Sequence, residues 1–400
     1  MTVKIGRQLW VVLHRYVGLA IAVFVAIAGL TGSVLAYIGP LREWLVPEPF
    51  AATASGVPMA FQNLGALVEA THADTRITQW PLALKSGHAA TFSVQGANDP
   101  ATGQPKALGL DAVWVDPVSG SILGQTSGDP GHTVAAQVLD FIYVLHYRLA
   151  LPGDGARWGV WIMGIAAILW FIDCFVGAWL TLPRGRPFFV KWRPAWGVKA
   201  RRLNFDLHRA GGLWFWGMLA VLALSSVQQN LNEEVLMPIA RLVLPLAPDP
   251  LAQRSERDPH APLPRQVVPE LIVERAMAQA SQRGWRDAPE RMQRDDARGV
   301  YRVIFTTPPV EWLTATRREL FFDDTSGALL YVFQPGRGRV GDSVLDWLSA
   351  LHFGTVFGWP YKLLLCVTGI VIAVLSWTGV VIWWRKRRGR AHNGLPGVDA

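Results

Sequence analysis

The stretch LHRYVGL at residues 13–19 opens the first long apolar segment of the chain, and LHRAGGL at 207–213 opens the third. A second motif, VLD followed by LH, ends at His146 and again at His352, just before the other two apolar segments. The first motif recurs after 194 positions and the second after 206. Two motifs that recur in the same order predict two structural repeats, each about 200 residues long.

Four apolar segments are long enough to cross a membrane as helices, which takes about 20 residues. They span residues 17–41, 159–182, 210–231 and 363–384. Asp173 is the one charge inside them, and we expect it to pair with a neighbour or to face the interior of the bundle. The first segment follows basic residues as a signal peptide would. Its apolar run is too long for the h-region of such a peptide, so an uncleaved span is predicted.

The composition agrees with a membrane protein. Hydrophobic residues make up 51% of the chain and charged residues 17%, whereas soluble proteins carry about 25% charge. This excludes a disordered chain and argues against an entirely soluble one. The two cysteines exclude a disulfide framework and a four-thiolate metal site.

Basic residues set the expected orientation. Residues 1–15, 183–209 and 385–400 together hold 16 Lys and Arg and two acidic residues. The positive-inside rule places these segments, and so both termini, in the cytoplasm of a bacterial inner membrane. Topology and contact with the lipid bilayer account for the basic clusters, so no nucleic-acid partner is expected. The net charge of +8 divides into a basic inner face and an acidic outer portion.

The predicted fold is an α-helical membrane protein with four transmembrane helices in two internal repeats and two small α+β periplasmic domains. The expected boundaries are 1–41 for the first span with its cytoplasmic N-terminus, 42–133 for the first periplasmic domain, 134–182 for a pre-helix and the second span, 183–206 for the cytoplasmic loop, 207–231 for the third span, 232–341 for the second periplasmic domain, 342–384 for a pre-helix and the fourth span, and 385–400 for the cytoplasmic tail.

Each periplasmic domain is expected to combine one helix with antiparallel strands. The helices are predicted at 64–73 and 269–283, and strands at 89–94, 112–115 and 300–306. Tight turns are expected at Asp116–Gly120 and Asp323–Gly327, because Asp and Gly are the usual residues of such turns. Backbone geometry explains these turn residues without a catalytic role.

Four of the nine histidines fall within the repeated motifs. They are His14, His208, His146 and His352. The other five, at 72, 88, 132, 260 and 392, are expected to be solvated. An ionisable group at membrane depth is costly and is usually functional. By topology, His14 and His208 lie near the cytoplasmic face, and His146 and His352 near the outer face.

Two facing imidazoles at one depth can supply both axial ligands of an iron porphyrin. Two such depths predict two b-type haems, with the four histidines as ligands of the haem iron. Arg15 and Arg209 are candidates for binding the haem propionates, or they serve only to set the topology. Small residues along the spans (Gly18, Ala22, Gly29 and Gly32 on the first) would admit a flat macrocycle, or they reflect ordinary helix packing.

A zinc site is the alternative for these histidines. Two histidines at each depth lack the third ligand of a catalytic zinc ion unless Asp140 and Asp346 contribute. Those carboxylates precede His146 and His352 by six residues, which places them on another face of the same helix.

The two repeated motifs and the DPxSG-type turn at Asp116–Gly120 resemble the PepSY-associated transmembrane family of bacterial inner-membrane proteins. The resemblance covers nearly the whole chain, and it implies that the periplasmic domains are PepSY-like. Some members are regarded as di-haem ferric-siderophore reductases, which implies haem ligation by the four histidines. The chain departs from the pattern at 151–155, where extra residues separate His146 from its span, and at Asp323-Asp324, where the first half has Asp116-Pro117.

The expected function is a di-haem electron conduit that reduces a ferric siderophore or another ferric chelate in the periplasm. The electron donor is an unknown cytoplasmic protein or a quinol, and no catalytic residue distinct from the haem ligands is expected. A quinone or a periplasmic redox protein is an alternative acceptor. A haem-free, membrane-anchored PepSY interaction or regulatory protein is the alternative from another class. The chain contains no Gly-rich dinucleotide fingerprint, so no nicotinamide or flavin site is expected.

Overall fold

The computed structural model describes residues 2–392 except 46–50, 53, 73–74, 85–86, 107, 127–132, 182–193, 195, 197–198, 248–250, 252–253, 262, 265, 307–316 and 335–337. His132, much of the predicted cytoplasmic loop and the last eight residues of the tail therefore lie outside the described residues. The chain forms two compact units. A helical unit comprises Met1–Arg42, Val138–Leu244 and Val344–Ala400, and a sheet unit comprises Glu43–Gln137 and Pro245–Ser343.

Within the described residues, the helical unit contains three helices that are long and apolar enough to cross a membrane. They are α1 (Thr2–Leu35), α5 (Gly155–Thr181) and α11 (Gly358–His392). The predicted third span is a bent pair instead, because α6 (Ala200–Trp214) meets the following helix at an angle of 69°. That helix continues through α7 (Trp216–Leu231), a π-helical turn (Asn232–Leu236) and α8 (Met237–Val243). The unit thus has three candidate spans, or four if the bent pair counts as one, which makes the protein a multi-pass membrane protein.

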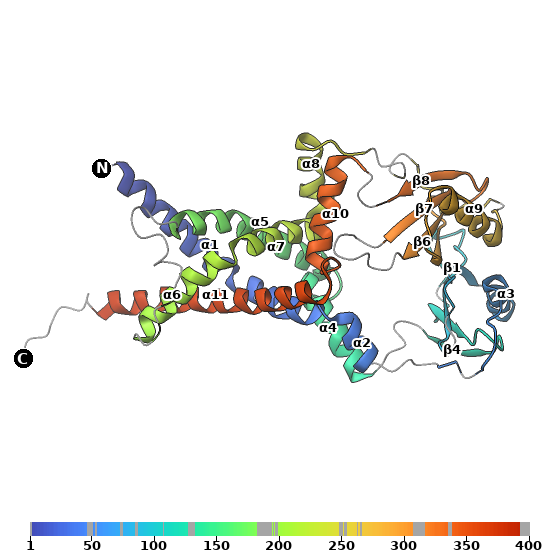
Figure 1. The fold of residues 1–400 in the computed structure, drawn as a ribbon, viewed down its shortest axis with the longest axis horizontal. Helices are drawn as coiled ribbons and strands as arrows, with labels where there is room; N and C mark the ends of the chain where they lie inside the picture. The colour runs from blue at the N-terminus through green and yellow to red at the C-terminus, as the bar shows by residue number, and fades with distance from the viewer. Residues whose placement is uncertain are drawn as a thin grey trace, which may run out of the picture. The chain divides into compact units, whose positions relative to one another are not determined.

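Helices α1 and α11 lie side by side (Figure 1), and glycines allow membrane helices to pack closely. A Cβ atom added to Gly29 of α1 would lie 2.6 Å from the carbonyl oxygen of Gly369 on α11. Ser33 of α1 donates a hydrogen bond of 2.9 Å to the Cys366 carbonyl on the same neighbour. Gly164 of α5 likewise makes room for Leu231 of α7. These glycines therefore serve helix packing.

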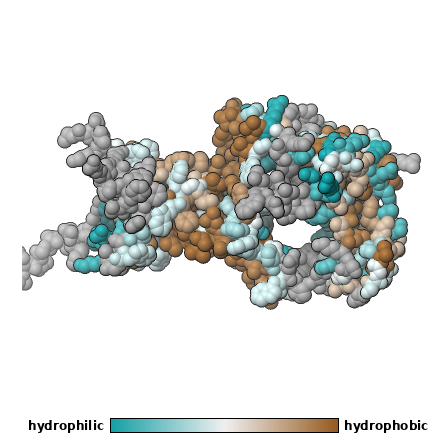
Figure 2. Space-filling model, in the orientation of Figure 1, coloured by the Kyte–Doolittle hydropathy of each residue, from teal (hydrophilic) through white to brown (hydrophobic). Residues whose placement is uncertain are grey.

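Apolar side chains cover much of the outside of the membrane helices (Figure 2). Ile172 of α5 and Ile370 of α11, for example, are 55% and 53% exposed. An apolar surface of this kind suits contact with lipid rather than with water.

Two short helices precede α5 and α11, as the sequence predicts. They are α4 (Val134–Arg148) and α10 (Val340–Phe353), and each carries a histidine in its last turn. Leu149 and Ala150 adopt positive φ angles of 59° and 52° after α4. The chain turns there and begins α5 at Gly155. At the first span, α1 ends at Leu35, so the end of the apolar segment 17–41 forms a turn and part of α2 (Ile38–Leu45).

The sheet unit is built on one antiparallel sheet of eight strands in the order β4-β3-β2-β1-β5-β6-β7-β8. The strands are β1 (Thr75–Pro81), β2 (Ala90–Gly96), β3 (Ala112–Val115), β4 (Ile122–Thr126), β5 (Pro289–Asp295), β6 (Val300–Thr306), β7 (Arg317–Asp323) and β8 (Leu329–Phe333). Strands β1 and β5 join the halves, with Trp80 opposite Met292. The sequence predicts two separate periplasmic domains, and this separation is wrong. The edge strands β1 and β5 pair, so the strands of both predicted domains form one sheet.

Helices α3 (Phe61–Thr71) and α9 (Pro269–Gln282) cover one face of the sheet (Figure 1). Leu64 and Ile272, one from each helix, are fully buried in the same core cluster as Phe92 and Phe305 of the sheet. The helix positions agree with the sequence to within three residues. Burial of one apolar face of each helix stabilises the unit.

Both predicted turns form. The Asp116 carboxylate accepts hydrogen bonds from the backbone N–H groups of Val118 and Ser119 at 2.9 and 3.0 Å. Asp323 accepts the equivalent bonds from Thr325 and Ser326. Gly120 and Gly327 follow with φ angles of +73° and +66°, which L residues rarely adopt. Asp116 corresponds to Asp323 in this geometry, and the turn residues have a structural role.

Candidate functional site

The four repeated histidines form two facing pairs in the helical unit. His14 of α1 and His208 of α6 have ring centres 6.2 Å apart and planes tilted by 58°; we call them the inner pair. His146 of α4 and His352 of α10 have ring centres 6.3 Å apart and a tilt of 55°; we call them the outer pair. The structure therefore brings together the residues that topology pairs in the sequence. The extra residues at 151–155 do not separate His146 from His352.

The spacing within each pair fits one metal ion between two imidazoles. A metal–imidazole bond is about 2 Å long, and the nitrogen lies roughly 1 Å from the ring centre, so two imidazoles on opposite sides of one ion have centres about 6 Å apart. Both pairs match this value within a few tenths of an ångström. An ion between the rings fixes the distance between their centres, whereas direct contact between two rings does not. The nearly equal distances in the two pairs therefore favour a bridging ion.

Hydroxyl groups fix the tautomer of three of the histidines. In the outer pair, Thr31 Oγ1 lies 2.9 Å from His146 Nδ1 and itself donates to the carbonyl of Ile27. Ser225 Oγ lies 2.8 Å from His352 Nδ1 and donates to the carbonyl of Leu222. Because each hydroxyl proton is used within its own helix, the hydroxyl oxygen accepts a proton from Nδ1. The Nε2 atom then carries the lone pair that a metal ligand requires.

The inner pair follows the same rule with different partners. His208 Nδ1 lies 3.0 Å from Thr378 Oγ1, which donates to the carbonyl of Val374, and 3.0 Å from the carbonyl of Leu375. His14 Nδ1 lies 2.9 Å from Asp173 Oδ1. Among the described residues none of the four Nε2 atoms has a hydrogen-bond partner. Metal-ligating histidines in proteins usually have this arrangement, in which Nδ1–H is held by an acceptor.

Glycines let three of the rings approach the neighbouring helices. A Cβ atom at Gly32 would lie 3.1 Å from Cε1 of His146, and one at Gly177 or Gly379 would lie 3.3 Å from Cε1 of His14 or His208. For Gly32 the sequence predicts either contact with a macrocycle or ordinary helix packing. The contacts of the three glycines show another use, since they admit the imidazole rings themselves.

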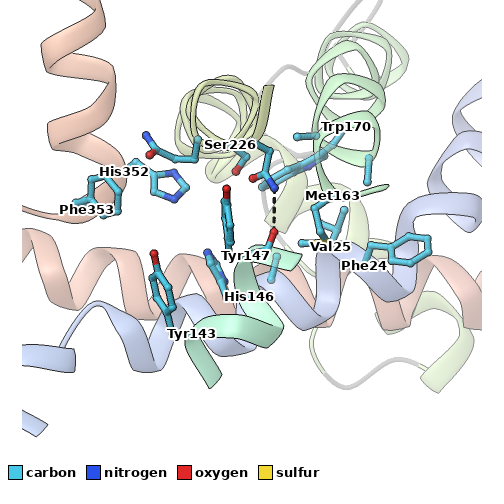
Figure 3. A pocket seen from close by; sticks show the side chains of 15 residues that line it. Phe24, Val25, Tyr143, His146, Tyr147, Met163, Trp170, Ser226, His352 and Phe353 are labelled. Atoms are coloured by element: carbon cyan, nitrogen blue, oxygen red, sulfur yellow. Dashed lines mark hydrogen bonds between the residues drawn. The ribbon is translucent and has the colours of Figure 1, made fainter. Parts of the chain in front are cut away.

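A cavity lies between the rings of the outer pair (Figure 3). Its volume is about 100 Å³. Figure 3 shows His146 and His352 directed into it, with Tyr143 and Tyr147 of α4 beside them. Its other walls are largely apolar, with Phe24, Val25, Met163, Trp170 and Phe353 among them. Residues of this kind can shield a flat hydrophobic cofactor from water.

The predicted propionate partners differ in their contacts. Arg209 Nη2 forms an ion pair of 3.0 Å with Asp206, which is 5% exposed. Arg15 has no ion pair among the described residues and stays a candidate for binding an anion. Within that same part of the chain, no group of three His, Cys, Asp or Glu side chains could hold a bare metal ion. Asp140 contacts Arg42 instead, so this carboxylate is engaged away from His146.

Sequence reasoning missed the partners of the histidines. Thr31 and Ser225 lie 194 positions apart, the same offset as His14 and His208, so the repeat itself carried that signal. Asp173 is the one charge in its span, and its partner is His14. Thr378 has no equivalent in the first half, where the position holds a valine, and no sequence signal marked it.

A second cavity lies within the sheet unit, between α3 and α9. It measures about 250 Å³, and Trp80, Arg294 and Tyr301 are part of its wall. The Arg294 side chain is 8% exposed and forms an ion pair of 3.0 Å with Asp296. It also donates a hydrogen bond to Gln266. These contacts engage Nη1 and Nε, whereas Nη2 is buried without a hydrogen-bond partner among the described residues.

Comparison with known families places the chain. The model of the family described as the PepSY-associated TM region matches residues 11–386, which include both histidine pairs and the sheet unit. Comparison with curated proteins gives no match. Because the family match extends over nearly the whole chain, the protein belongs to the PepSY-associated transmembrane family.

Proposed function

We propose that the protein is a transmembrane electron conduit that holds two b-type haems and reduces ferric iron in a chelate on the outer side of a bacterial inner membrane. One observation carries the proposal: two histidine pairs have ring centres 6.2 and 6.3 Å apart, and all four Nδ1 atoms are held by acceptors. Four Nε2 lone pairs are then available, two at each site, as hexacoordinate haem iron requires.

The chain's own residues bind and orient the cofactors. His14 with His208, and His146 with His352, would hold the iron from both sides. Asp173, Thr31, Ser225 and Thr378 fix the ring orientations, and so keep the sites formed before the cofactor binds. Bound haem supplies one-electron transfer between the two faces of the membrane.

At the outer face each ferric ion takes up one electron and becomes ferrous, and no bond within the chelating molecule breaks. The lower charge of the ferrous ion weakens its attraction to oxygen ligands, so iron is released from the chelate. A quinol or a cytoplasmic redox protein supplies the electron. The basic segments 1–15 and 183–209 support an orientation with both termini in the cytoplasm.

Re-oxidation by a ferric chelate tests this function. The protein is reduced in lipid nanodiscs, separated from the reductant and mixed with ferric citrate. The reduced haem bands should disappear while ferrous iron appears in a chromogenic chelator. Gallium citrate, which has the same charge but no accessible lower oxidation state, is the matched control. Equal rates with the two metal complexes would contradict the reductase function.

A further inference from the structure

The four histidines differ in the charge of the group that holds Nδ1. Three partners are neutral: the hydroxyl groups of Thr31, Ser225 and Thr378, the last supported by a backbone carbonyl. His14 alone of the four is held by a carboxylate, with Nδ1 2.9 Å from Asp173 Oδ1. The Asp173 side chain is 11% exposed, so its charge is only weakly screened by solvent.

The carboxylate has no counterpart in the second half of the chain. Gly177 and Gly379 occupy equivalent places, since each faces Cε1 of an inner-pair histidine. Four residues before them stand Asp173 and Leu375. In the second half the backbone carbonyl of Leu375 and the Thr378 hydroxyl do the work of the carboxylate. Orientation of the ring therefore does not need a charge, and Asp173 must contribute something that a neutral acceptor does not.

A carboxylate that accepts the Nδ1 proton makes the imidazole a stronger electron donor. It also places a negative charge near the metal, which favours the ferric over the ferrous state. Both effects lower the reduction potential of iron bound at Nε2. Asp206, a buried acid two residues before His208 on α6, differs in this respect because Arg209 neutralises it at 3.0 Å.

We propose that Asp173 makes the inner-pair haem the low-potential cofactor of the protein, so that electrons run downhill from the inner pair to the outer pair. This inference rests on the proposed function. Asp173 is a positioning residue in it, since the carboxylate acts through His14 and does not touch the iron. The outer pair, held by two hydroxyl groups, is the high-potential site. The direction of electron flow would thus be built into one side chain that only the first repeat carries.

Spectroscopic redox titration of the purified full-length protein tests the inference. The wild type should show two components. Asp173→Asn retains an acceptor oxygen and removes the charge. It should raise the reduction potential of the low-potential component and leave the other component unchanged. The expected change in the reduction equilibrium is at least tenfold, which is about 59 mV for a one-electron couple. Asp173→Leu, which places at this position the residue found at the equivalent position 375, should raise this potential further. Thr378→Val is the matched control, since it removes a neutral partner from the other inner histidine and should move the same component less.

The possible outcomes distinguish failure of this inference from failure of the proposed function. Wild-type protein without haem overturns the proposed function, and this inference with it. Two bound haems whose potentials stay unchanged in Asp173→Asn, or a shift of the higher component instead, overturn the inference and leave the proposed function standing. If Asp173→Asn loses the inner haem, Thr378→Asp decides. A second carboxylate beside the inner pair should decrease the reduction potential of the low-potential haem further. An unchanged potential would overturn the inference.

Discussion

The ring centres of His146 and His352 lie 6.3 Å apart, although 206 positions separate the two residues in the sequence. Each ring is held from a different helix, His146 by Thr31 of α1 and His352 by Ser225 of α7. The pair is therefore organised by the helices around it before any ligand binds, which lowers the ordering cost of binding.

Loss of one histidine should remove one haem. His352→Ala and His14→Ala should each reduce the haem content from about two to about one per chain, because each site would lose one of the two imidazoles that hold its iron. Pyridine haemochrome assays of purified protein measure this. His72→Ala is the control, since His72 bonds to Gln125 in the sheet unit and should leave both haems bound. Unchanged haem content in both test variants would show that the pairing is wrong.

Gly32→Val should disrupt the outer pair selectively. A Cβ atom at position 32 would stand 3.1 Å from Cε1 of His146, and the additional methyl groups would push the ring away from Thr31. We expect loss of the outer haem with the inner haem retained. Gly6→Val is the matched control on the same helix α1, because nothing lies within 4 Å of a Cβ atom there. Equal haem loss in the two variants would indicate a general effect of valine on this helix.

Ser225→Ala should loosen the outer haem without removing a ligand. The variant frees Nδ1 of His352, and loss of such a partner typically lowers affinity about 10- to 100-fold. Transfer of haem from the protein to apomyoglobin should accelerate for one of the two haems. Ser376→Ala is the control, since Ser376 also donates to its own helix, at Ile372. A transfer rate that equals that of the control would contradict a role for Ser225.

The Asp323 turn should make the stability of the sheet unit depend on pH. Burial raises the pKa of Asp323, but hydrogen bonds from Thr325, Arg254 and Ser326 outweigh it and hold the pKa well below its usual range. The stabilisation is present above the unfolded pKa of about 4 and is lost as the pH falls towards the lower folded pKa.

Asp323→Asn should therefore cost about 1–3 kcal/mol of stability at pH 7, and the difference from wild type should narrow below about pH 4. Thermal unfolding followed by far-ultraviolet circular dichroism measures it. Arg298→Ala, which removes an exposed partner of Glu256 and Asp295, should cost much less. A difference that is constant from pH 7 to pH 3 would argue against this account of the turn.

Local patterns in the sequence predicted much of the architecture. Apolar length located α1, α5 and α11, because lipid admits few charges, and strands β3 and β6 have the bounds expected from their alternation. Other features depend on contacts between distant segments. The bend between α6 and α7 lies within an uninterrupted apolar run, and the pairing of β1 with β5 joins strands more than 200 positions apart.

The candidate site likewise combines features that the sequence predicts with features that depend on contacts between distant segments. The repeat and the topology of the spans predicted which histidines pair, because a residue's depth follows from the end of the span it occupies. The groups that hold Nδ1 could not be predicted individually, since a Ser or Thr in a membrane helix usually bonds only to its own backbone. Thr31 and Ser225 each bond both to a carbonyl of their own helix and to a histidine of a neighbouring helix. Only the positions of the neighbouring helices reveal the second bond.

The haem content of the protein tests the central claim most directly. Protein purified from haem-replete cells should be red. Its reduced-minus-oxidised spectrum should be of the b type, with about two haems per chain and low-spin iron coordinated by two histidines. A colourless preparation without haem would contradict the account and would favour a membrane-anchored interaction protein instead.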